Sequence, residues 1–476
     1  MGFPSINKNE ELFYQELVKA GYPNDRISRE FQLDDYRPDF AILPPGLAQY
    51  PMLVYEVKND LQTGMEWGNG AIAAKLRKRF AFPILVYCSA EQVLIDVDTA
   101  NAMKTQSFLP TYEALKQKWL TDRTFISSLI LENFMSFKSA DFHFGSKLNV
   151  IIGENGSGKT QLLKLIYTIA RSLAYEPEEK AVKIDFSRFA IREVFGANKF
   201  EEFITGSKKN NSNEALVRFA LSGQKEYETL SIKDKIVISG SARKMSNTTL
   251  YDKGTAVFLP THELLSIFPG FNYLRQVYQG KWPYDQTYSD SVTYLGLPII
   301  ESQKVFSKAI IQEVEKGISG HIYLNEQGTR FLMQMKRSRA IYEIPMVAEG
   351  WRKIGQLLQL INTGAIHPGS ILLWDEPEAN LNPRLICLIA KVIVELSKSG
   401  IQVFVTTHSL FFLRELSMLI KSKKTPANSF EKGEVRFFNF VENGRVEQGD
   451  DEVELGSVLL LDESLRQSDR YLLEDY

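Results

Sequence analysis

The strongest constraint on the fold is the segment GENGSGKT at residues 153–160, which follows the apolar run LNVII and precedes a helical pattern. Its glycines allow the backbone to curl, so that several N–H groups point at one phosphate, and the following helix adds positive potential at its N-terminus. We expect Lys159 to reach the β- and γ-phosphates of a nucleotide and Thr160 to bind Mg²⁺. The predicted phosphate-binding residues are Gly153, Glu154, Asn155, Gly156, Ser157, Gly158, Lys159 and Thr160.

Two further apolar strands end in polar residues that suit the same chemistry. SILLWDEPEANLNP at residues 370–383 delivers Asp375 at the carboxyl end of a buried strand, where open α/β sheets bind ligands. We expect Asp375 to hold the metal and Glu376 to orient and polarise the attacking water. QVFVTTHS at residues 402–409 places His408 at the end of another strand, where it can contact a γ-phosphate.

Together these motifs resemble the ABC-type ATPases of the SMC/RecF/OLD group, over residues 125–476. The resemblance implies that GENGSGKT is the Walker A motif, LLWDEP the Walker B motif, ANLNP the D-loop and His408 the switch histidine. ATP and Mg²⁺ are the implied cofactors. ILENFMSFKSADFHF at residues 130–144 resembles the strand pair whose loop borders the adenine in that group, which makes Phe134, Phe137 and Lys138 candidates.

Such ATPases complete each nucleotide site with a signature helix from a second subunit, so the resemblance implies an ATP-dependent homodimer or higher oligomer. The matching segment is VAEGW at residues 347–351, where Ala348 stands in the position of the usual serine. Gly350 would then supply a backbone dipole to the partner's nucleotide, and Arg352 and Lys353 would supply charge.

The predicted fold class is α/β, with an N-terminal restriction-endonuclease-like α/β domain followed by an ABC-type P-loop ATPase that carries a large mixed insertion. We place the first domain at residues 1–120, the ATPase at 121–476 and the insertion at residues ~175 to 345. Strands alternating with helices after residue 347 predict a parallel sheet. FLPTHELLSIF at residues 258–268 is interpreted as structural, the alternative being that Glu263 or His262 senses the site.

A second candidate site lies near the N-terminus. Asp39 begins one short strand, and Glu56 and Lys58 share one face of the next, because strand side chains alternate with period two. Two carboxylates and the Val57 carbonyl make an oxygen-rich Mg²⁺ site. A metal-bound water can then attack a phosphodiester, with Lys58 positioning it or stabilising the developing charge.

This pattern resembles the PD-(D/E)xK nuclease superfamily across residues 5–100. The superfamily often adds an acid from an N-terminal helix; Glu10 has the best register for this role, with Glu11 and Glu16 as rivals. The basic segment KLRKRF at residues 75–80 is either a DNA-contacting helix or a solvated helix face. A degenerate nuclease fold that only binds is the alternative to a cleaving enzyme.

The net charge of -2 shows no overall basic character, so any nucleic-acid binding would come from local patches. Two cysteines in separate apolar runs and no long apolar span favour a cytoplasmic protein without a membrane segment.

Three functions fit these sequence features. The first is an ATP-gated nuclease in bacterial anti-phage defence. The second is an ATPase sensor or scaffold that recognises foreign DNA or a phage protein and restrains or releases a separate toxic effector, with a non-catalytic N-terminal domain. The third is a RecF-like DNA-repair ATPase.

Overall fold

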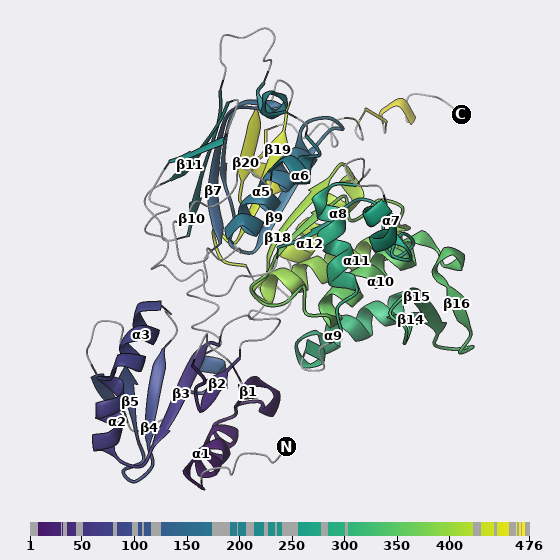
Figure 1. Cartoon of the computed structure of the whole chain (residues 1–476). Coiled ribbons are helices and arrows are strands. Elements are labelled where there is room, and N and C mark those ends of the chain that lie inside the picture. Colours follow the sequence, from purple (N-terminus) through teal and green to yellow (C-terminus); the bar gives the residue numbers. More distant parts are fainter. Residues whose placement is uncertain are drawn as a thin grey trace. The chain divides into compact units, whose positions relative to one another are not determined.

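A computed structural model of the chain divides into two compact units (Figure 1). The first consists mainly of Met1–Thr124, and the second of Phe125–Arg243 and Gly254–Tyr476. The structure describes residues 8–29, 31, 36–43, 51–79, 83–97, 103–106, 109–115, 125–173, 191–197, 199–205, 214–222, 227–233, 236–239, 256–277, 284–299, 303–421, 430–441, 445–456, 463, 466–467 and 469–471. The boundary that the sequence analysis places between residues 120 and 121 lies outside them.

The first unit is one mixed sheet with helices on both faces, as Figure 1 shows. Its elements are α1 (Lys8–Lys19), β1 (Ile27–Ser28), β2 (Phe40–Ile42), β3 (Leu53–Lys58), α2 (Leu61–Gly68), α3 (Ala71–Arg79), β4 (Ile84–Cys88), β5 (Val93–Val97) and β6 (Met103–Gln106). The strands follow one another in sequence order across the sheet, and only β3 and β4 pair in parallel.

The alternation of side chains along β3 builds two cores. Leu53 and Tyr55 pack with Phe13 of α1 on one face, and Val54 packs with Leu76 of α3 on the other. The two strands predicted around Asp39 and Glu56 are present as β2 and β3. Residues 75–79 of the basic segment fall on α3, but their charged side chains lie outside the described part of the chain.

The second unit contains the nucleotide motifs. Its elements are β7 (Ile126–Phe134), β8 (Phe137–His143), β9 (Leu148–Gly153), α5 (Lys159–Leu173), α6 (Ile191–Phe195), β10 (Ala215–Leu221), β11 (Glu228–Ile232), β12 (Ile236–Ser239), β13 (Ala256–Leu259), α7 (Phe271–Val277), α8 (Gln286–Leu295), α9 (Gln303–Gly317), β14 (Gly320–Leu324), β15 (Phe331–Met335), β16 (Ile341–Glu343), α10 (Glu349–Asn362), β17 (Ile371–Asp375), α11 (Pro383–Lys398), β18 (Gln402–Thr407), α12 (Leu410–Ile420), β19 (Val435–Phe440) and β20 (Val446–Gly449).

The predicted parallel sheet is confirmed. Its strand order is β13-β17-β18-β9-β19-β20, with every neighbour parallel except the last pair. This order sets the ends of the three motif strands, β17, β18 and β9, side by side. α5 packs against β13, β17, β18 and β9. α8 contacts β13 and α11 contacts β18, while α9 and α10 pack on each other and α10 on the small sheet β14-β15-β16.

The insertion predicted at residues ~175 to 345 is not a separate body. Its strands β10 and β11 extend the antiparallel sheet β12-β11-β10-β7-β8, and its strand β13 forms the edge of the parallel sheet beside β17. The mixed, loop-interrupted pattern concealed these strands, because neither their partners nor their register can be read from local periodicity. Within the described residues of the insertion, the helices α6 to α9 and the sheet β14-β15-β16 lie outside the two main sheets.

Buried amides join the two main sheets. The Gln402 side chain at the start of β18 accepts a hydrogen bond from the Ile126 N–H at 3.3 Å and donates to the carbonyls of Ile126 and Gly145, each at 3.0 Å. Asn149 of β9 donates to the same Gly145 carbonyl at 3.0 Å and accepts from the Gly145 N–H at 2.8 Å. These bonds fix the strand that bears the phosphate loop to the antiparallel sheet.

Among the described residues, no helix has the length and apolar character needed to cross a bilayer.

Replacing Gln402 with leucine should therefore destabilise the second unit. The substitution keeps the volume but removes the Gln402 hydrogen bonds to the Ile126 N–H and carbonyl, and leaving buried polar groups unpaired costs on the order of 1–3 kcal/mol. Scanning calorimetry of the full chain should show a lowered melting temperature for one transition. The exposed Gln334→Leu should leave both transitions in place, and an unchanged melting temperature for Gln402→Leu would contradict the assigned role.

Candidate functional site

The phosphate loop runs from the end of β9 to the first turn of α5. Gly156 and Gly158 have φ angles of 80° and 101°, a region that glycine enters without strain. A Cβ atom on Gly158 would lie 3.1 Å from the Phe137 ring, so the loop and the β7–β8 hairpin approach too closely for a side chain. Gly156 faces open space, which leaves its backbone accessible to a ligand.

Two side chains in the loop suit a bound phosphate. The Lys159 Nζ donates to the carbonyls of Gly153 and Glu154, both at 2.8 Å, and burial lowers its pKa against the attraction of the nearby acids, Glu376 first among them. The buried Ser157 hydroxyl has no hydrogen-bond partner among the described residues. A bound anion would accept hydrogen bonds from both groups, because the hydroxyl is unsatisfied and the ammonium is held only by neutral carbonyls.

Asp375 joins the two metal-binding motifs. Its Oδ2 accepts from the Thr160 hydroxyl at 2.8 Å, and its Oδ1 accepts from the Thr406 hydroxyl at 2.5 Å. Thr160 opens α5, Asp375 ends β17 and Thr406 lies near the end of β18. Hydroxyl and carboxylate oxygens are the ligands that Mg²⁺ prefers, so this pair fits the ion that accompanies a nucleotide.

Glu376 and His408 also meet. The His408 Nδ1 lies 2.9 Å from Glu376 Oε1, and the Glu376 N–H donates to the Thr406 hydroxyl at 3.0 Å. Glu376 has a φ of 48°, a left-handed conformation that is uncommon for a residue with a side chain. The turn that follows β17 therefore aims this carboxylate at the end of β18.

Sequence reasoning missed Glu378. Its side chain is buried, its Oε1 accepts from the Thr407 hydroxyl at 2.6 Å, and burial raises its pKa. The Oε2 atom has no partner among the described residues. The DEPE run contains this glutamate, but only the fold reveals that it turns inward against Thr407, because nothing in the local pattern separates it from a solvated loop acid.

The structure corrects the expectation for Arg352 and Lys353. Arg352 pairs with Glu263 at 2.8 Å, and the buried Lys353 donates to the Glu376 carbonyl at 2.7 Å. Burial lowers the Lys353 pKa to about 8. Both side chains thus contact their own subunit. Gly350 is buried, and a Cβ there would lie 3.0 Å from the Leu381 side chain, which would have to shift to admit it. The contribution of Gly350 to a partner's site stays a prediction.

Two aromatic candidates for the adenine site are core residues. Phe134 and Phe137 are fully buried: Phe134 stacks on Phe203 with ring centroids 6.0 Å apart, and Phe137 packs edge-on against Phe142 and Phe440. Alternation along β7 and β8 points them inward. Lys138 is exposed, and its contact with the adenine stays a prediction.

The structural interpretation of residues 258–268 agrees with the contacts. The Glu263 carboxylate pairs with Arg352 and accepts from the Ser266 N–H at 3.1 Å, and the Leu264 N–H donates to the buried Gln356 side chain at 2.6 Å. These bonds attach the segment after β13 to α10. His262 is exposed.

The N-terminal candidates converge as the sequence predicted. Lys58 Nζ lies 2.7 Å from Glu56 Oε2, the Tyr36 hydroxyl donates to Glu56 Oε1, and the Val57 N–H donates to Asp39 Oδ2 at 2.7 Å. Burial raises the pKa of Glu56, with Lys58 opposing it. The cluster therefore has two acids and a lysine at adjacent strand ends.

Of the three helical acids, Glu10 belongs with this cluster. Its pKa is raised first by burial and then by Asp39, whereas Glu11 pairs with Arg29 and Glu16 with Lys19, each at 3.0 Å. Across the described residues, no group of three or more His, Cys, Asp or Glu side chains is arranged to hold a metal ion. Asp39 and Glu56 are instead satisfied by protein donors.

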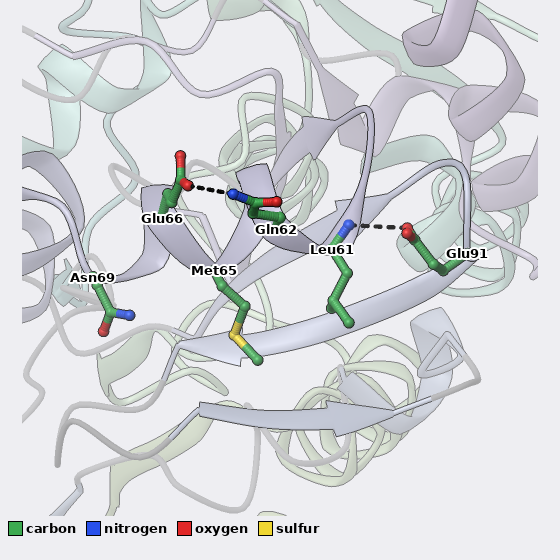
Figure 2. Close-up of a pocket in the computed structure, with 6 residues that line it drawn as sticks. All are labelled: Leu61, Gln62, Met65, Glu66, Asn69 and Glu91. Carbon is green, nitrogen blue, oxygen red and sulfur yellow. Dashed lines mark hydrogen bonds between the residues drawn. The ribbon is translucent and has the colours of Figure 1, made fainter.

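An open hollow of about 800 Å³ in the first unit is lined by other residues: Leu61, Gln62, Met65, Glu66, Asn69 and Glu91. Figure 2 shows them on α2 and the β4–β5 turn, with Gln62 bonded to Glu66 at 3.1 Å and the Leu61 N–H bonded to Glu91 at 2.9 Å. None of the predicted site residues lines it.

The phosphate loop, the paired Thr160 and Asp375 and the paired Glu376 and His408, on this strand order, define a P-loop ATPase of the ABC type. The family model of the RecF/RecN/SMC N terminal domain matches residues 125–429, which is more than half of the chain. The chain belongs to this family. It is thus an SMC/RecF-type ATPase, and ATP and Mg²⁺ are its cofactors.

Similar proteins are of two kinds. The DNA replication and repair proteins RecF of Francisella tularensis subsp. novicida (strain U112) and subsp. tularensis (strain SCHU S4 / Schu 4) are each 34% identical over 91 residues, 19% of this chain and 26% of RecF. The match thus spans about a quarter of these relatives. The Smc head domain of Pyrococcus furiosus bound to the C-terminal domain of ScpA (12% identity, TM-score 0.41) covers 73% of this chain and 100% of its own. The SMC head domain from Thermotoga maritima (13%, 0.37) covers 68% and 98%.

The contact between Thr160 and Asp375 predicts how metal removal acts. Thr160→Val keeps the shape of the side chain but removes the hydroxyl. The factor by which Mg²⁺ strengthens ATP binding should therefore be about 10–100-fold smaller than in the wild type, which is the equivalent of one hydrogen bond to a charged group. Titration of a fluorescent ATP analogue with Mg²⁺ and with EDTA measures this ratio. Thr293→Val, on the exposed side of α8, is the matched control; a wild-type ratio in Thr160→Val would count against the assignment.

Proposed function

We propose that the second unit hydrolyses ATP at the ends of β9, β17 and β18, and that ATP binding and hydrolysis control the first unit as a metal-dependent nuclease in anti-phage defence. The observation that carries the ATPase part is the pairing of Glu376 with His408 at 2.9 Å beside the Thr160–Asp375 pair. It supports a water held between a carboxylate and the terminal phosphate.

In this mechanism the loop amides and Lys159 bind the phosphates, and Thr160 and Asp375 hold Mg²⁺. Mg²⁺ neutralises charge on the phosphates when it is bound. Glu376 accepts a hydrogen bond from the attacking water and orients it, and His408 keeps the carboxylate in place and contacts the γ-phosphate. A signature segment from a second copy of the chain, containing Gly350, would close each site.

Glu376→Gln should lower kcat for ATP hydrolysis by at least about 100-fold, because the amide cannot polarise the water, while ATP affinity stays close to that of the wild type. Phosphate release and ATP titration measure the two quantities. The trapped ATP state should also appear as a dimer by light scattering. A monomer with ATP would refute the shared site, and unchanged kcat would refute the assignment of Glu376.

The nuclease part of the proposal depends on the convergence of Asp39, Glu56 and Lys58, with Glu10 nearby. The chain has the acid and lysine groups that phosphodiester hydrolysis with Mg²⁺ requires. The protein donors that now satisfy Asp39 and Glu56 would have to give way to the ion. ATP would bias two arrangements of a dimer, and only one would admit nucleic acid.

Wild type, Lys159→Ala, Glu376→Gln and Asp39→Ala/Lys58→Ala should be incubated with plasmid, linear DNA and RNA, with Mg²⁺ and with or without ATP. We expect cleavage by wild type that depends on ATP and is lost in Asp39→Ala/Lys58→Ala, while this variant still hydrolyses ATP. Glu11→Ala/Lys19→Ala, which removes an exposed acid and an exposed lysine from the same unit, is the matched control. If wild type cuts nothing and in-cell protection survives Asp39→Ala/Lys58→Ala, the nuclease proposal is wrong.

The match to RecF supports a second candidate, a DNA-repair ATPase, because the 34% identity over 91 residues is to replication and repair proteins. In that case ATP-dependent DNA binding would occur without cleavage. An ATPase sensor that restrains a separate effector in response to a phage-derived trigger would instead copurify with that effector, and would need no acid at Asp39.

A further inference from the structure

Lys353 occupies an unusual position in the first turns of α10. Its side chain is only 3% exposed, and its Nζ donates to the carbonyls of Glu376 at 2.7 Å and Ala379 at 3.3 Å. The surrounding charges are those of Glu378, Glu376, Glu349 and Asp375. Burying an ammonium on neutral carbonyls is unfavourable compared with an apolar side chain of similar volume, so packing alone does not account for a lysine here.

The two carbonyls belong to a strained turn. Glu376 and Asn380 have φ angles of 48° and 63°, and neither is a glycine. Each such conformation costs on the order of 1–3 kcal/mol and persists only where the surroundings enforce it. Lys353 binds the carbonyl of Glu376 itself and that of Ala379, the residue before Asn380, so the ammonium holds both strained positions at once.

α10 contacts the same turn at two further points. Glu349 accepts a hydrogen bond from the Asn380 side chain at 2.9 Å, and Glu349 and Lys353 share a helix face because they are four residues apart. Between them, a Cβ on Gly350 would lie 3.4 Å from the Asn380 carbonyl. The N-terminal turns of α10 and the loop after β17 therefore form one bonded assembly.

The same turn contains Glu376, the proposed catalytic carboxylate. The Glu376 N–H is held by the Thr406 hydroxyl and the Glu376 carboxylate lies against His408, while the Glu376 carbonyl is held by Lys353. The peptide groups of Glu376 are thus fixed from β18 on one side and from α10 on the other. Rotation of this backbone would carry the carboxylate away from His408.

We propose that Lys353 is a positioning residue that holds Glu376 in the conformation needed to orient water, and so makes hydrolysis depend on where α10 lies. The inference rests on the proposed ATP hydrolysis by this site. Lys353 touches neither nucleotide nor metal; it acts through the backbone of Glu376. A displacement of the start of α10, which directly follows Ala348, would release the carboxylate and stop hydrolysis with ATP still bound.

The test compares Lys353→Met and Lys353→Arg in the full-length chain, with Lys391→Met on the exposed face of α11 as the matched control. Lys353→Met should lower kcat about 10–100-fold, the cost of a misplaced catalytic group, with ATP affinity and melting temperature near wild type. Lys353→Arg should recover part of kcat, because it keeps donors for the carbonyls. If Lys353→Met does not fold, Lys353→Gln replaces it in the same comparison.

A double-mutant cycle with Glu376→Gln separates positioning from general damage. If Lys353 acts through Glu376, adding Lys353→Met to Glu376→Gln should change the residual rate by less than about 2-fold. Multiplicative losses, an equal loss of ATP affinity, or wild-type kcat in Lys353→Met would each overturn the inference. Failure of the proposed function looks different: wild type and Glu376→Gln would then hydrolyse ATP at the same rate, or not at all.

Discussion

The second unit depends on one contact, the 2.8 Å hydrogen bond between the Thr160 hydroxyl and Asp375. It joins the helix that follows the phosphate loop to the strand that bears the acidic motif, two segments more than 200 residues apart in sequence. Around it, Thr406 binds the other Asp375 oxygen, and the same hydroxyl accepts from the Glu376 N–H. The start of α5 and the end of β18 are therefore both fixed to the carboxylate at the end of β17, and the positions of Glu376 and His408 follow from it.

The sequence was informative where chemistry and periodicity coincide. The P-loop, the parallel strands β17 and β18 and the helix α5 are each specified by a local pattern of glycine, apolar residues and a terminal polar residue, and the acids of the first unit follow from period two along β3. The sequence did not reveal which strands pair when they lie far apart in the chain. β13 lies beside β17, and β10 beside β7, because of sheet partners that no local pattern encodes. Phe134 and Phe137 were candidate ligand contacts through the family resemblance alone, and alternation along β7 and β8 turns both into the core.

The sequence also did not predict the direction in which three charged side chains point. Arg352, Lys353 and Glu378 are charged residues next to recognised motifs, and a sequence places such residues at a surface by default. The fold turns all three toward the interior of the unit, where each meets a specific partner: Glu263, the Glu376 carbonyl and Thr407. Burying a charge is unfavourable unless it has a polar partner. These contacts supply that partner for each of the three charged side chains near the nucleotide motifs.

The strand order also governs how the chain can fold during synthesis. The fully buried β9 pairs only with β18 and β19, so Leu148 finds its neighbours Val403 and Val435 more than 250 residues later. Until then the strand that supports the phosphate loop lacks both partners and exposes an apolar surface to the ribosome exit environment. Contacts of such high sequence separation slow folding. The first unit, whose strands pair in sequence order, does not depend on contacts with such distant strands.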